Sequence, residues 1–129
     1  MHLFGRLILI LAIIDTLAVA SLKAQSLTNF GGGTSDALGL NDSDQVVGYY
    51  GSEAFLYSDG TLTNLGTLGG NVAVAQSIND SGQIVGYSNT SSYQTDAFLY
   101  SNGTMTDLGN LGGTSIANRI NNSGQVVGY

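Results

Sequence analysis

The stretch NDSGQIVGY, residues 79–87, decides the fold, because near copies occur as NDSDQVVGY at 41–49 and NNSGQVVGY at 121–129. Its first half has turn chemistry. The Asn79 side chain can bond the backbone two residues on, and Gly82 can take the left-handed conformation that closes a bulged hairpin. The second half, QIVGY, has the β-branched and aromatic residues of a strand. The phrase therefore predicts a hairpin turn and the strand that returns from it.

Two features of the phrase support this interpretation. In the first copy Asp44 stands where the others have glycine, and Asp tolerates the left-handed region better than most residues do. Each returning strand also contains a glycine, at Gly48, Gly86 and Gly128. A glycine inside a strand indicates a bulge or the close approach of a neighbouring backbone.

A second phrase repeats between the turns: AFLYSDGTLTNLGTLGG at 54–70 returns as AFLYSNGTMTDLGNLGG at 97–113. Asp-Gly and Asn-Gly supply the positive φ of tight hairpins, so AFLY pairs with the strand that follows it. The LGG segment is expected to bend the chain toward the next hairpin. The predicted structural turns are therefore Gly60, Gly70, Gly82, Gly103, Gly113 and Gly124.

The spacing of the repeats is that of a propeller blade. Asn41 and Asn79 lie 38 residues apart, and the two long phrases lie 43 apart; strand repeats of about 40 to 45 residues are typical of propeller blades. We predict an all-β fold, an incomplete β-propeller-like array of four-stranded antiparallel blades. Its expected units are a partial one over 25–50 and two full ones over 51–88 and 89–129.

Both faces of the predicted strands are apolar. In AFLY, alternation places Phe55 and Tyr57 on one face, with Ala54 and Leu56 on the other. Strands of this kind belong to a sheet that is covered on both sides, as a blade between two others is.

Residues 1–24 have the pattern of a secretory signal peptide, expected as a helix. Arg6 precedes the apolar run LILILAII, and small residues follow. Cleavage after Ala20 or after Ala24 fits the pattern. An uncleaved anchor is the alternative, although Asp15 within the apolar run disfavours a permanent membrane span. The expected location is outside the bacterial cell or in its envelope, with no stable membrane span after cleavage.

The part that follows residue 24 is acidic. It carries eight acids against one base, Arg119, which gives a formal charge of −7. Such a surface repels phosphate backbones, so we expect no nucleic-acid partner. The chain has no cysteine, so repetition rather than disulfides must stabilise the domain.

The same part lacks histidine and lysine, because His2 and Lys23 lie in the signal segment. This excludes His-activated nucleophiles and lysine Schiff bases. We therefore expect no catalytic residues and no cofactor.

Two weaker site hypotheses remain. Asn41, Asp42 and Asp44 offer alternating oxygens of the kind that calcium uses, but the late bidentate Glu of a calcium loop is missing and the charges do not recur in the other copies. A turn explains the same residues. For partner binding, the loops after the QVVGY and QIVGY strands carry aromatic and acidic side chains; the candidates are Tyr50, Glu53, Tyr93 and Asp96.

The phrases AFLYSNGTMTDLG, LGG and INDSGQIVGY resemble the repeats of the HAF family of extracellular bacterial proteins, over about Leu27 to Tyr129. The resemblance implies an exported, propeller-like β-repeat protein without an established activity. The family's His-Ala-Phe triplet is here Glu53-Ala54-Phe55 and Asp96-Ala97-Phe98. The role of its histidine is therefore not carried over.

Three blade equivalents fall short of the usual four to eight. We expect either the front of a longer reading frame or a truncated paralogue. If the chain is complete, it should present open β edges that invite self-association. The predicted function is an exported, non-catalytic binding module for an unknown extracellular glycan or protein. The alternatives are a carboxylate-dependent carbohydrate-active enzyme and a calcium-dependent surface adhesin.

Overall fold

The computed structural model describes residues 9–14, 21–26 and 34–129. The chain divides into two compact units, Met1–Thr34 and Ser35–Tyr129. Within the described residues every regular element is a β-strand, which confirms the predicted all-β class.

The first unit contains one antiparallel pair, β1 (Leu9–Ile14) and β2 (Ser21–Ser26). Residues 9–14 were expected to belong to a signal helix, but the structure places them in a strand. A short apolar run that ends in Ile-Ile suits either element, and its periodicity cannot decide between them. Of the two predicted cleavage points, Ala24 lies in β2, whereas Ala20 and the strand expected at 27–30 lie outside the described residues.

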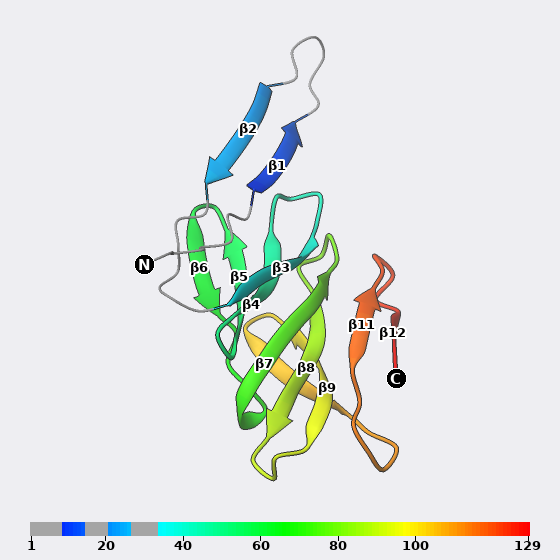
Figure 1. Ribbon diagram of the computed structural model, residues 1–129. Helices are drawn as coiled ribbons and strands as arrows, with labels where there is room; N and C mark the ends of the chain where they lie inside the picture. The colour runs from blue at the N-terminus through cyan, green and yellow to red at the C-terminus, as the bar shows by residue number, and fades with distance from the viewer. Residues whose placement is uncertain (1–8, 15–20, 27–33) are drawn as a thin grey trace, which may run out of the picture. The chain divides into compact units, whose positions relative to one another are not determined.

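The second unit consists of antiparallel sheets whose strands follow chain order (Figure 1). The first sheet contains β3 (Ser35–Leu40), β4 (Val46–Tyr50), β5 (Glu53–Ser58) and β6 (Thr61–Asn64). The second contains β7 (Gly69–Ile78), β8 (Ile84–Thr90), β9 (Thr95–Ser101) and β10 (Thr104–Gly109). The third is the two-stranded pair β11 (Ala117–Ile120) and β12 (Val126–Gly128).

Each observed four-stranded sheet begins two strands earlier in the chain than the predicted unit that contains the same AFLY hairpin. Each four-stranded sheet joins the hairpin at the NDS(D/G)Q turn to the AFLY hairpin that follows it, whereas the units 51–88 and 89–129 begin at AFLY. The physical reason is the short turn between the hairpins. Only Gly51 and Ser52 separate β4 from β5, which forces the two strands to pair as antiparallel neighbours.

The sheets pack in chain order, with β7 against β3, β4 and β5, and β11 against β7 and β8. Figure 1 shows the second sheet between the first sheet and the β11–β12 pair. Its two faces belong to two separate apolar cores. Ile84 and Phe98 pack toward the first sheet, whereas Val85 and Ala97 pack toward β11. The prediction of a sheet covered on both faces is thus confirmed for the second sheet.

The in-strand glycines mark a repeated close contact. A Cβ atom on Gly48, Gly86 or Gly128 would lie 1.9 to 2.0 Å from a backbone carbonyl oxygen, which belongs to Asp36 in β3, Val74 in β7 and Ile116 just before β11, respectively. Each of these strand pairs also shifts register beside that contact, as the β7–β8 pair does between Ala75 and Ser77. Both features that the sequence offered as alternatives, a bulge and a close approach, therefore occur together.

The turn glycines divide into two kinds. Positive φ angles occur at Gly60, Gly82, Gly103 and Gly124, and Asp44, at φ 58°, has the conformation of the glycines that it replaces. Gly70 instead lies in β7, where a Cβ atom would come within 2.6 Å of Asn89. In the LGG segments the positive φ belongs to Gly69 and Gly112, one residue before Gly70 and Gly113.

Candidate functional site

The repeated turn holds successive sheets together through its asparagines. The Asn79 side chain is buried and makes four hydrogen bonds. Its Oδ1 accepts from the backbone of Ser81 (3.1 Å) and Gln83 (2.9 Å). Its Nδ2 donates to Gln83 Oε1 (2.8 Å) and to the Asn121 carbonyl oxygen of the next turn (3.1 Å). Two of these bonds shape the turn, one fixes the glutamine, and one links to the neighbouring repeat.

Asn41 repeats this arrangement one turn earlier, with Nδ2 donating to the Asn79 carbonyl oxygen at 3.0 Å. A second set of hydrogen bonds links the turns through Asp80. Asp42 N donates to Asp80 Oδ1 (2.9 Å), and Asn122 Nδ2 donates to Asp80 Oδ2 (2.6 Å). The carboxylate of Asp80 therefore binds the turns on either side of it.

Two of the calcium candidates, Asn41 and Asp42, take part in these contacts, Asn41 through its side chain and Asp42 through its backbone N–H. Asn41 uses both acceptor and both donor positions of its amide, since Ser43, Gln45 and the next turn take all four. Asp44 occupies the positive-φ position of the turn. In the described part of the chain, no group of three or more His, Cys, Asp or Glu is placed to hold a metal ion.

The four partner-binding candidates fall into different environments. Tyr50 and Glu53 face each other across the β4–β5 turn, and the hydrogen bond to Glu53, with desolvation and the charge of Glu53, raises the pKa of the Tyr50 phenol. Tyr93 is 79% exposed at the tip of the β8–β9 turn. Asp96 is buried, and its Oδ1 accepts from Asn110 Nδ2 at 2.6 Å. Asp96 thus anchors the β10–β11 connection, and its side chain is too buried to contact a partner at the surface.

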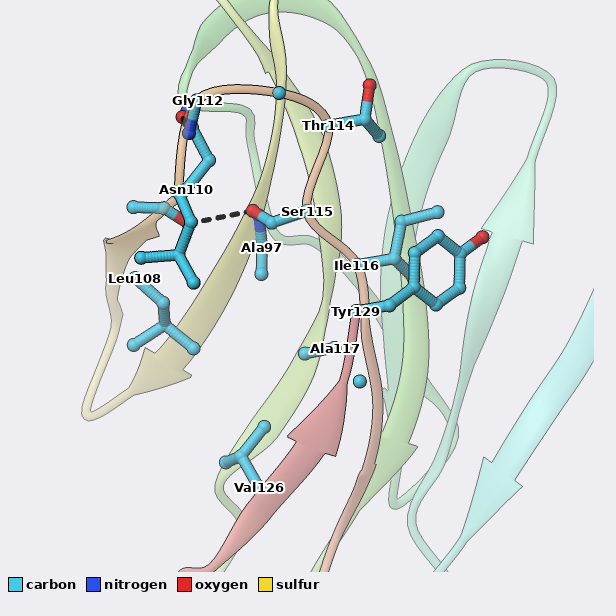
Figure 2. A pocket seen from close by; sticks show the side chains of 14 residues that line it. Ala97, Leu108, Asn110, Gly112, Thr114, Ser115, Ile116, Ala117, Val126 and Tyr129 are labelled. Atoms are coloured by element: carbon cyan, nitrogen blue, oxygen red, sulfur yellow. Dashed lines mark hydrogen bonds between the residues drawn. The ribbon is translucent and has the colours of Figure 1, made fainter.

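A cleft of about 820 Å³ lies at the β11–β12 end of the array (Figure 2). One side is the connection from β10 to β11, which Ser115 holds by accepting from Ala97 N (2.8 Å) and donating to the Gly109 carbonyl (2.7 Å). The other side is β12. The apolar side chains around it are Ala97, Leu108, Leu111, Ile116, Ala117, Val126 and Tyr129.

Several of these apolar side chains are open to solvent, unlike their counterparts one repeat earlier. Leu108 is 46% exposed, whereas the equivalent Leu65 is 5% exposed. Val126 is 36% exposed, whereas Ile84 is fully buried. Leu111 is completely exposed. An uncovered apolar surface around a cleft is typical of a binding site.

Sequence reasoning missed this cleft. Leu108 and Leu111 belong to the LGG phrase, and Val126 to the NNSGQ phrase, and both phrases were explained as turns and strands. The available signal was the alignment of the repeats, which places Leu108 at the position of Leu65 and Val126 at the position of Ile84.

No family model, curated protein or solved structure matches the chain. The resemblance to HAF repeats therefore rests on the quoted phrases alone. In the described ranges there is no helix with the length and apolar character needed to cross a membrane.

Proposed function

We propose that this protein is an exported, non-catalytic β-repeat scaffold of the HAF type that binds another polypeptide through the cleft at its β11–β12 end. In this proposal the sheets are blades of an incomplete propeller-like array. The signal-like residues 1–24 support export, and the repeated phrases support the family.

The observation that carries the proposal is the contrast between the two sets of repeated residues. The polar groups of the repeated turns already bond one another, as Asn79 and Asp80 do, so they have little capacity left for a ligand. Leu108, Leu111 and Val126, by contrast, surround a cleft and remain exposed. Recognition at this site would depend on apolar burial and backbone pairing, which favours a polypeptide over a glycan.

The test is binding of the fluorescently labelled full chain to arrays of overlapping peptides and of glycans. We compare wild type with Leu111→Ser and Leu108→Ser in the cleft, with Tyr93→Ala in the exposed loop, and with Leu38→Ser as an exposed apolar control on β3. We expect peptide signals that Leu111→Ser and Leu108→Ser remove and that the other two variants keep.

Binding to glycans alone, or loss of signal only with Tyr93→Ala, would place recognition elsewhere and refute the cleft as the binding site. Export is tested separately by fusing residues 1–24 to a reporter that folds only outside the cytoplasm. An inactive reporter would contradict it.

A further inference from the structure

The sequence contains a single Asn-Gly pair, Asn102-Gly103, which forms the turn between β9 and β10. Glycine has no Cβ atom, so its backbone nitrogen can approach the side chain of the preceding residue with the least hindrance. Every other asparagine in the sequence is followed by a larger residue. Asn102 is therefore the asparagine whose side-chain amide is most open to attack by the backbone.

The surroundings of Asn102 leave its side chain unrestrained. Asn102, Gly103 and Thr104 are exposed, and a Cβ atom on Gly103 would meet nothing within 4 Å. Within the described residues the Asn102 side chain makes no hydrogen bond. The Asn79 side chain, by contrast, is buried and makes four. The fold thus holds the amide of the repeated turn in place and leaves the amide at the hairpin tip able to react.

We propose that Asn102 is a site of spontaneous covalent modification by water. The Gly103 backbone nitrogen loses its proton and attacks Asn102 Cγ. The new C–N bond closes a succinimide ring, and the Cγ–Nδ2 bond breaks as ammonia leaves with that proton. Water then opens the ring at one of its two carbonyl groups, which gives either aspartate or isoaspartate, in which the backbone runs through the former side chain. Neither step involves the cleft.

The first sheet already contains a copy of the aspartate product. The equivalent turn between β5 and β6 is Asp59-Gly60, with φ angles of 51° and 81°, and the corresponding angles at Asn102 and Gly103 are 52° and 80°. Both turns place two residues between the last paired positions of their strands. An aspartate therefore fits this turn as well as an asparagine does, and the aspartate product should leave the hairpin intact.

The isoaspartate product does not fit the same turn. It adds one atom to the backbone of a two-residue turn, whose positive φ angles match the twist of the paired strands. In the part of the chain that the structure describes, β10 pairs with β9 alone. Met105 in β10 lies opposite Tyr100, and both pack against the apolar core between the first and second sheets. We expect the longer turn to release β10 from β9 and to expose Met105.

The experiment follows the full chain during incubation in warm, mildly alkaline buffer. Peptide mass spectrometry locates the exchange of NH2 for OH, and fragmentation distinguishes aspartate from isoaspartate. We expect Asn102 to react before any other asparagine. Its rate should rise with hydroxide concentration, because the Gly103 nitrogen must lose its proton.

The two products are then compared for stability. Asn102→Asp reproduces the aspartate product and should keep the urea midpoint of the fresh wild type. The isoaspartate form, separated by chromatography, should have a lower midpoint. Its hydrogen exchange should be faster than that of the wild type in β10 and unchanged in β8, because only the edge strand is released.

Matched variants separate the effect of sequence from that of structure. Asp80→Gly creates a second Asn-Gly pair, at Asn79, whose amide is held by hydrogen bonds. In the folded variant Asn102 should react and Asn79 should not, whereas in concentrated urea both should react at similar rates. Asp59→Asn gives the first hairpin the same sequence as the second, and its new asparagine should react as fast as Asn102. This second variant serves if Asp80→Gly does not fold.

Three results would overturn the proposal. The first is an Asn102 that stays intact in the folded chain while it reacts in urea, because the turn would then protect it. The second is equal reaction of Asn79 and Asn102 in folded Asp80→Gly, because hydrogen bonding would then not select the site. The third is an isoaspartate form with the urea midpoint and the β10 exchange of the wild type.

Discussion

Replacement of Asn79 by Ala measures how strongly the repeated turn links the sheets. The substitution removes four hydrogen bonds, and each has a net value of about 1 kcal/mol. Water can reach part of the turn and restore some of this, so we expect a loss of about 3 kcal/mol in the free energy of unfolding.

Asn121 is the matched control because its own turn is the same but its side chain is exposed. It accepts from Ser123 N and Gln125 N and donates to Gln125 Oε1, and no bond from it to a further turn occurs in the described residues. Solvent replaces most of these bonds in the variant, so Asn121→Ala should cost about 1 kcal/mol. The difference of about 2 kcal/mol is the contribution of burial and of the link between repeats.

Asn79→Asp separates the two roles of the side chain. It keeps oxygen acceptors for the Ser81 and Gln83 amides but loses both Nδ2 donors, and it places a carboxylate beside the Asn121 carbonyl. We expect it to lose at least about 2 kcal/mol.

Urea unfolding of the full chain gives all three values, compared at equal m. Equal losses for Asn79→Ala and Asn121→Ala would refute the reasoning, since the turn alone would then carry the whole effect.

Two further predictions concern the backbone contacts and the β4–β5 turn. Gly86→Ala should destabilise the fold by about 3 kcal/mol or more in urea unfolding, because the new Cβ would lie 2.0 Å from the Val74 carbonyl oxygen; Gly113→Ala, with open space around it, should change stability by less than about 0.5 kcal/mol. Since the folded-state pKa of Tyr50 is raised, its contribution to stability is present below the unfolded pKa of about 10 and is lost as pH rises through the folded value. Glu53→Gln should lower the Tyr50 pKa toward its ordinary value in a phenolate absorbance titration, and an unchanged titration would contradict the assigned cause.

Much of the local structure could be predicted because short-range patterns determine it. The alternation in AFLY and QIVGY predicted the strands, and the Asp-Gly and Asn-Gly pairs predicted their hairpins. The conformation of Asp44 followed from its alignment with Gly82 alone. In each case a few neighbouring residues fix the backbone, so no distant contact is needed.

The sequence by itself determined the period of this protein, its strands and its turns, because these depend on side-chain alternation and on residues that allow positive φ. It could not determine which two consecutive hairpins form one sheet, since a tandem repeat has no unique beginning. The two-residue turn between β4 and β5 decides which hairpins share a sheet. Only the tertiary structure showed that Asn79 bonds the next turn, that Asp96 is buried, and that Leu108 and Val126 border one cleft. Those facts depend on how separate sheets pack, and residues far apart along the chain meet only there.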